Sequence, residues 1–181
     1  DIPISISAFP KPGYEFVGWE GIADSNRIQY NCNSDGLLTA VFQFSDEIIL
    51  QNVVTENTTL EGYQSYVVQE DITINPGVTF IVTEGVKISM PEDGNIIVEG
   101  QLIINGTEQN PVEIIPHSSA QDNRWGAICF NNATDSSSLN HFKLKGASVG
   151  IDPSTHKGAI SGLNSDVSIS NAEIKDVLFP I

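Results

Sequence analysis

Basic side chains are scarce in this sequence. Its 181 residues include 8 Lys and Arg against 23 Asp and Glu, which gives a formal net charge of -15 at pH 7. An electrostatic field of that sign repels nucleic acids and anionic membrane surfaces, so we expect neither as a partner. The acidic composition with few lysines also favours an exported bacterial protein, located at the cell surface or outside the cell.

Cysteines and long apolar runs are scarce as well. The two cysteines, Cys32 and Cys129, fall in different predicted domains, so a disulfide is possible but not implied, and no zinc-ligand spacing is present. No run approaches the roughly 20 apolar residues that a membrane span needs, and the opening residues lack the features of a signal peptide. We therefore expect no membrane insertion within this chain. Without a phosphate-binding loop or a metal motif, we also expect no cofactor.

Closely spaced β-strand patterns are abundant, most clearly between Asp71 and Asn105. Five short runs rich in β-formers follow one another there: Ile72–Ile74, Val78–Val82, Val86–Met90, Ile96–Val98 and Leu102–Ile104. Only turns that contain Gly or Pro separate them, and these residues supply the backbone angles of tight turns. Since no run has the length or the apolar spacing of a helix, the stretch predicts strand and turn in repetition.

These strand patterns recur at an interval near 24 residues. The recurring apolar positions form three series, which we predict to lie over one another: Ile72, Ile96 and Ile128; Phe80 and Ile103; Ile88 and Ile114. The gaps are 24 and 32 residues in the first series, and the longer gap contains the polar insertion Pro116–Arg124. Three short strands in each period indicate a solenoid of roughly four to five coils from Thr59 to Ile181, stacked about 4.8 Å apart.

The segment before residue 45 has a different pattern, and polar residues near that position predict a domain boundary. We expect strands at Ile4–Ala8, Tyr14–Trp19 and Leu37–Phe42. The spacing A-x-P-x-x-G-Y-x-F-V-G-W-x-G, followed by L-T-A-V-F, resembles the internalin-type B repeat, a small β module of bacterial surface proteins. Because members of that family usually carry further strands before the position of Ile4, the resemblance implies a partial module over residues 1–44.

Three aromatic residues of this module have two interpretations. Tyr14, Phe16 and Trp19 could form a stacking surface for sugar rings, or they could form the core of a module too small to have another. The packing interpretation is favoured, because small domains depend heavily on a few aromatic side chains.

Residues 58–130 carry a second resemblance. The stretches TTLEGYQSYVVQEDITINPGVTFIVTEGVKISM, IIVEGQLIINGTEQNPVEIIP and RWGAICF are similar to the opening coils of bacterial right-handed parallel β-helix surface proteins of the pectin-lyase-like architecture. The resemblance implies an all-β protein with a right-handed parallel β-helix over residues 45–181, truncated at its C-terminal end. Within it, Ile48–Tyr66 is either a first irregular coil or a cap over the end of the stack.

The pectin-lyase-like architecture houses both enzymes and non-catalytic surface proteins, so fold alone does not decide function. Polygalacturonase-type hydrolases use paired aspartates as acid and base, and their N-T-D, D-D, G-H-G and R-I-K elements are absent. The W-x-D-H and R-x-P-x-x-R elements of pectate-lyase-type enzymes are absent too, so we assign no catalytic residue. The favoured function is a non-catalytic extracellular module for adhesion, glycan recognition or spacing. The alternative is the N-terminal part of a polysaccharide lyase or glycoside hydrolase whose active site lies beyond residue 181.

The candidate binding residues cluster around the segment His141–Lys145 and the insertion. Alternation predicts that Phe142 and Leu144 point inward while their neighbours point outward. The candidate set is His141, Lys143, Lys145, Arg124 and Trp125. We interpret the cations as a groove that binds an acidic glycan, either a polysaccharide or a host or cell-surface glycan, by charge-assisted hydrogen bonds. The alternatives are an ordinary solvated strand face and, for Trp125, packing beside a turn.

Other polar residues have weaker claims to a site. Asp122, Asp135 and Asp152 could join a calcium site, but aspartates also favour turns because they bond to their own backbone, so no metal site is predicted. His117 and His156 lie in predicted loops with no partner at ligand spacing, and we expect both at the surface.

Overall fold

The structure, a computed structural model, describes residues 3–8, 14–22, 25, 27–30, 37–44 and 47–180. The chain divides into two units, Asp1–Asp46 (unit 1) and Glu47–Ile181 (unit 2). Within the described ranges, the regular elements are β-strands apart from one short 3-10 helix, η1 (Gln121–Asn123). The all-β class predicted from the sequence is therefore confirmed.

Unit 1 contains two antiparallel strand pairs among its described residues. Its strands are β1 (Ile4–Ser7), β2 (Tyr14–Trp19), β3 (Arg27–Tyr30) and β4 (Ala40–Phe44), with β1 paired to β3 and β2 to β4. The Phe16 ring meets Trp19 and Phe42 edge-on, with ring centroids 5.8 and 5.6 Å apart, and Trp19 is buried. Phe16 and Trp19 thus have the packing role, whereas Tyr14 is 46% exposed.

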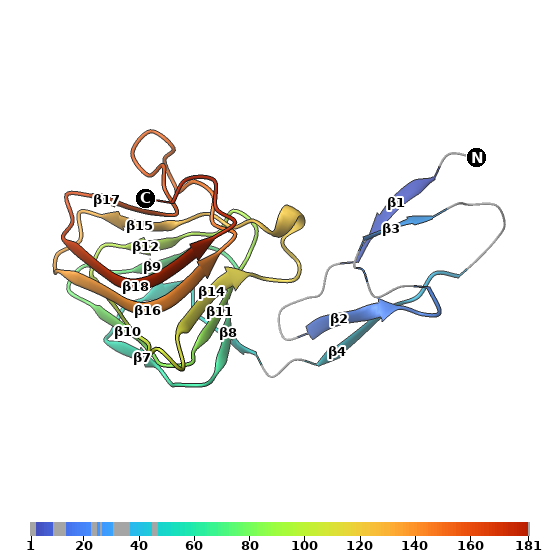
Figure 1. The fold of residues 1–181 in the computed structure, drawn as a ribbon, viewed down its shortest axis with the longest axis horizontal. Helices are drawn as coiled ribbons and strands as arrows, with labels where there is room; N and C mark the ends of the chain where they lie inside the picture. Colours follow the sequence, from blue (N-terminus) through green and yellow to red (C-terminus); the bar gives the residue numbers. More distant parts are fainter. Residues whose placement is uncertain are drawn as a thin grey trace. The chain divides into compact units, whose positions relative to one another are not determined.

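One sheet of unit 2 has five short strands that are parallel to their neighbours (Figure 1). They are β6 (Val53–Val54), β9 (Ile72–Ile74), β12 (Ile96–Val98), β15 (Ile128–Asn131) and β17 (Ile160–Leu163). The spatial order β17-β15-β12-β9-β6 follows the sequence, so each strand pairs with the one a full repeat earlier.

A second sheet has nine strands and bends into two halves. One half contains β7 (Thr58–Leu60), β10 (Thr79–Thr83) and β13 (Gln101–Asn105); the other contains β5 (Ile48–Ile49), β8 (Ser65–Val67), β11 (Lys87–Met90) and β14 (Val112–Pro116). The long strands β16 (Ser137–Lys145) and β18 (Val167–Lys175) belong to both halves. The early residues of β16 pair with β13 and its late residues with β14, and between them His141 has a left-handed φ of 48°.

The start of unit 2 belongs to the parallel stack. Strand β5 pairs with β8, and β6 pairs with β9. Of the two interpretations for Ile48–Tyr66, the first layer of the stack is therefore the one that the pairing supports. The five runs predicted between Asp71 and Asn105 are confirmed as β9 to β13, with bounds that differ by at most one residue.

The first apolar series has the predicted register. Ile96 pairs with Ile72 on one side and with Ile128 on the other, although the second repeat contains the insertion. Ile88 likewise pairs with Ile114. The inserted residues therefore leave the strand pairing intact.

The pairing predicted for the second apolar series was wrong by one residue. Phe80 pairs with Leu102 and not with Ile103. Side chains of a strand alternate between its two faces, so a shift of one residue exchanges core and surface. Phe80 and Leu102 are both buried, and Ile103 is only half-buried.

The inward faces of the strands form one hydrophobic core in unit 2. In β10, for example, Phe80 and Val82 are buried while Thr79, Ile81 and Thr83 are partly exposed. Burial of one such apolar side chain contributes about 1.5–3 kcal/mol, so the stack depends on many like positions in register. Among the largest fully buried side chains are Trp125, Phe130, Phe142, Ile74, Ile104 and Leu144.

Strand β15 is buried on both faces. Ile128 points into the core, and Cys129, on the opposite face, is also fully buried. A loop covers that face: an added Cβ at Gly150 would overlap the Cys129 Sγ and come within 2.7 Å of the His156 Cβ. Cys129 is a free thiol, whereas Cys32 lies outside the described residues.

Both histidines expected at the surface are in fact buried. His156 is 2% exposed, with Nδ1 3.0 Å from the Thr155 hydroxyl. His117 is 5% exposed and its Nε2 lies 3.6 Å from a Glu47 carboxylate oxygen. The prediction was wrong because both rings meet residues that are distant in the sequence, Phe130 for His156 and Glu47 for His117, which loop composition does not indicate.

Gly106 permits a close approach of two layers. An added Cβ there would overlap the His141 carbonyl oxygen and lie 2.9 Å from the Val112 amide nitrogen. We expect Gly106→Ala to lower the free energy of unfolding by about 1–3 kcal/mol, because backbone atoms cannot move aside cheaply. Gly162→Ala is the matched control, since its nearest neighbour atom is 3.9 Å away. Chemical denaturation of the whole chain measures the difference; equal losses for both variants would contradict the packing shown.

The buried thiol should be unreactive in the native state. Burial is the main cause that raises the pKa of Cys129 to about 11. Because the thiolate is the nucleophile, we expect iodoacetamide at about pH 8 to leave Cys129 unmodified until the protein is unfolded. Peptide mass spectrometry, which separates Cys129 from Cys32, measures the extent of alkylation. Rapid native alkylation would show that the covering loop opens readily.

Candidate functional site

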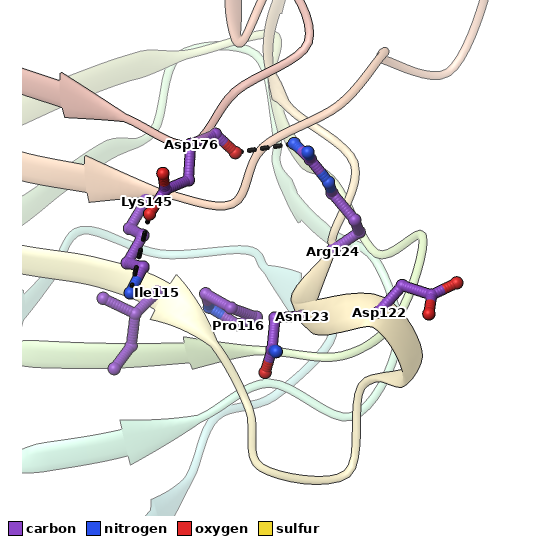
Figure 2. Close-up of a pocket in the computed structure, with 7 residues that line it drawn as sticks. All are labelled: Ile115, Pro116, Asp122, Asn123, Arg124, Lys145 and Asp176. Atoms are coloured by element: carbon purple, nitrogen blue, oxygen red, sulfur yellow. Dashed lines mark hydrogen bonds and ion pairs between the residues drawn. The ribbon is translucent and has the colours of Figure 1, made fainter.

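A groove of about 480 Å³ lies where β14 and β16 end, beside the polar insertion. We call it the insertion groove (Figure 2). Its lining residues are Ile115, Pro116, Asp122, Asn123, Arg124, Lys145 and Asp176. Ile115 and Pro116 end β14, Lys145 ends β16, and Asp176 directly follows β18, so ends of three neighbouring strands build the groove together with the insertion.

Arg124 connects the insertion to the later strands. Two left-handed residues precede it, Asp122 with φ 55° and Asn123 with φ 52°, and they turn the chain back toward the stack. Its Nη1 donates to the Asp176 carbonyl oxygen at 2.6 Å and to the Ala147 carbonyl oxygen at 3.4 Å. The guanidinium group is thus held at one wall of the groove, while the Asp122 side chain points away from Lys145 (Figure 2).

Lys145 supplies the second cation of the groove. Its Nζ lies 3.6 Å from a carboxylate oxygen of Asp176, and the two side chains are 58% and 69% exposed. An exposed ion pair of this kind contributes about 0–1 kcal/mol, because water screens both charges. Lys145 can therefore exchange Asp176 for another carboxylate at little cost.

A row of alternating charges crosses the same sheet next to the groove. In register across β11, β14, β16 and β18, it consists of Lys87, Glu113, Lys143 and Glu173. Lys143 Nζ lies 3.9 Å from Glu113. Opposite charges on neighbouring strands attract, and like charges would repel.

Lys175 forms the closest ion pair of this surface, with Glu173. The hydrogen bond and charge of Lys175 lower the pKa of the Glu173 carboxyl below its ordinary value, and Lys143 adds to that effect. The same pair raises the pKa of Lys175. Both groups are thus charged at neutral pH and bind each other on the open surface.

The sheet surface around the groove is locally balanced in charge. It holds four of the chain's 8 basic residues, namely Arg124, Lys143, Lys145 and Lys175. The carboxylates among the same lining residues are Glu113, Asp122, Glu173 and Asp176. In a chain with a net charge of -15, an area without net charge repels an anionic ligand less than an acidic surface does.

The predicted strand alternation is confirmed for most of the segment His141–Lys145. Phe142 and Leu144 are 1% exposed, while Lys143 and Lys145 face solvent. His141 is half-buried at the bend of β16 and does not line the insertion groove. The structure therefore brings Arg124 and Lys145 together, with Lys143 in an adjoining hollow.

Trp125 does not belong to the binding surface. It has no exposed area, and its Nε1 donates to the Lys145 carbonyl oxygen at 2.7 Å. Stacking on a sugar is thereby excluded in this structure, and the packing interpretation fits. Trp125 still matters to the groove, because it fixes the backbone of Lys145 from inside.

The three aspartates considered for calcium are dispersed. Asp122 lines the groove, Asp135 accepts a hydrogen bond from the Thr134 hydroxyl, and Asp152 accepts bonds from the Ser154 amide and hydroxyl. The hydrogen bonds from Ser154 hold the pKa of Asp152 below its ordinary value. Such bonds to the residue two positions on are typical of an aspartate in a turn. In the described part of the chain, no three His, Cys, Asp or Glu side chains are grouped to hold a metal ion.

Sequence reasoning missed Asp176 and the cross-strand partners of the lysines. A signal for them exists in the repeat of Asn140–Lys145, NHFKLK, as Ser170–Lys175, SNAEIK, thirty residues later. Aligning these two stretches places Lys143 beside Glu173 and Lys145 beside Lys175, which is the observed register.

Comparisons of the chain with protein-family models, with curated proteins and with solved structures gave no match. Among the described residues, no helix is long and apolar enough to cross a membrane. The two resemblances therefore remain expectations, and function has to be argued from the site.

The contribution of the alternating row to stability should depend on the positive charge of Lys143. Lys143→Glu would place three carboxylates in register, and we expect it to lower the free energy of unfolding by about 1 kcal/mol. Lys157→Glu, an exposed loop position, makes the same charge change without carboxylates in register and is the control. Urea denaturation at low and high salt measures both, and the difference should shrink with salt. A difference that persists in high salt would point to packing instead.

Proposed function

We propose that unit 2 is a right-handed parallel β-helix that serves as a non-catalytic surface module and binds an acidic polysaccharide in the insertion groove. Parallel pairing at intervals of one repeat, such as Ile96 with Ile72 on one side and Ile128 on the other, supports the solenoid part of this proposal. An exported, cell-surface location is part of the proposal and rests on composition and on the resemblance.

One observation carries the binding function: half of the chain's 8 basic residues gather around one groove and its adjoining hollow. Arg124 and Lys145 stand on two sides of a groove large enough for a sugar unit, at about 480 Å³. A uronate carries both the carboxylate that these cations favour and hydroxyls for Asn123 and the neighbouring carboxylates.

The ion pairs already present do not prevent this binding. The Lys145 and Asp176 side chains are both exposed, so their pairing is weak and a ligand carboxylate can replace Asp176. Arg124 uses Nη1 for two backbone carbonyls, which orients the group without a competing carboxylate at that atom. We therefore expect modest affinity that falls as salt rises.

The test is binding to polygalacturonate, with and without calcium, by gel electrophoresis in the presence of the polysaccharide. We expect Lys143→Ala/Lys145→Ala to weaken binding about tenfold, because charge-assisted hydrogen bonds are lost. Lys157→Ala, which removes one exposed loop cation, should bind like the original chain.

Three outcomes would contradict the proposal. Equal binding by the double variant would remove the groove from the site. Absence of binding would leave a structural spacer as the better account. Ultraviolet absorbance from unsaturated uronate products would overturn the non-catalytic assignment and favour a lyase.

A further inference from the structure

A second hollow, of about 430 Å³, lies at the corner between the two halves of the nine-stranded sheet. It shares no lining residue with the insertion groove. We call it the corner hollow. Its walls come from the turns that follow β7, β10 and β13, and they include Tyr63, Thr83, Glu84, Asn105 and Thr107.

Tyr63 presents an open aromatic ring in this hollow. The residue is 64% exposed. Its hydroxyl donates to Glu84 Oε1 at 3.0 Å, and its backbone amide donates to the Glu84 carbonyl oxygen at 3.2 Å. The hydrogen bond from Tyr63 to Glu84 also raises the pKa of the phenol, so the hydroxyl keeps its proton.

The other side of the ring lies against Gly85. A Cβ added to Gly85 would come within 2.7 and 2.9 Å of the Tyr63 Cδ1 and Cε1 atoms. Tyr63 itself has a left-handed φ of 60°, which is unfavourable for a bulky residue. The turn therefore keeps the Tyr63 ring fixed at the surface. Because the ring is not buried, no hydrophobic stabilisation offsets the strain of its backbone conformation.

A column of polar side chains runs from the same corner along the stack. Thr83, Asn105, Asn140 and Ser170 occupy matching positions of β10, β13, β16 and β18. Neighbouring members are about 4.8 Å apart, as strands of one sheet are. At the far end, the Asn140 side-chain oxygen accepts bonds from Ser170 Oγ and Asn171 Nδ2, both at 2.9 Å. The column thus places hydroxyl and amide groups in one line, of which the Thr83 hydroxyl already donates to the Leu60 carbonyl oxygen at 2.8 Å.

Charge decides the class of ligand. None of the residues that line the corner hollow is basic, and Glu84 places a carboxylate beside the ring. An anionic ligand would meet this carboxylate and the negative field of the whole chain. A neutral ligand rich in hydroxyls would find acceptors in Glu84 and the polar column, and an apolar surface on Tyr63.

We propose that the corner hollow binds a neutral polysaccharide, with one sugar ring lying on Tyr63 and its hydroxyls bonded to Glu84 and Asn105. The polar column extends the site along the stack, so further sugar units of an extended chain follow Asn140 and Ser170. The corner hollow and the insertion groove are formed by different residues. This proposal therefore does not depend on whether the insertion groove binds an acidic glycan.

The experiment is electrophoresis of the full chain in gels that contain galactomannan, xyloglucan or mixed-linkage β-glucan. We expect retardation by at least one of them, and we expect Tyr63→Ala to weaken binding about tenfold through loss of the ring surface. Tyr63→Phe keeps that surface and should bind nearly as well as the original chain. Binding that survives in Tyr63→Phe and fails in Tyr63→Ala assigns the ring its role.

Two controls separate this site from misfolding and from the insertion groove. Thermal melting of both Tyr63 variants shows whether unit 2 remains folded, and Lys143→Ala/Lys145→Ala should bind neutral polysaccharide unchanged. The proposal is overturned if no neutral polysaccharide retards the original chain, or if folded Tyr63→Ala binds as strongly as the original. Loss of binding in the lysine variant alone would place the neutral ligand in the insertion groove.

Discussion

The constraint on which unit 2 depends is the register of its parallel strands. Most strands are only a few residues long and bury one small face, so no layer can be stable alone. Ile96 is stabilised because it lies between Ile72 and Ile128, and a shift of its strand by one residue would turn Ile96 away from the core. The close approach at Gly106 and the hydrogen bonds between layers add to this requirement, since both exist only in the observed register.

The same register organises the outer surface. Side chains at equivalent positions of successive repeats become neighbours in space, so they form lines of side chains across the surface of the sheet. The alternating row carries Lys87, Glu113 and Lys143, and the polar column carries the uncharged groups Thr83 and Asn105. Two chemically different surfaces thus arise on one sheet from residues that are separated by a single bend.

Much of the fold was predictable because Gly and Pro turns mark the ends of its strands. The pairing of Ile88 with Ile114 followed from spacing alone, whereas Phe80 was assigned to the wrong neighbour, since a run such as Leu102–Ile104 offers apolar residues on both faces. The site was harder to predict. Alternation placed Lys145 outward, but the partner of Arg124, the Asp176 carbonyl, is a backbone atom 52 residues away. The burial of His117 depends equally on a distant contact, with Glu47.

The insertion between β14 and β15 shows how this architecture tolerates added chain. The gap from Ile96 to Ile128 is longer than the gap from Ile72 to Ile96, yet the strand pairing continues unchanged. The extra residues leave the stack as a loop and return to it at Trp125, which is anchored in the core. The exposed position at Ser118, ahead of the groove residues Asp122 and Asn123, can therefore be regarded as a natural display position, where a foreign peptide could be presented on a rigid support with both its ends held in place.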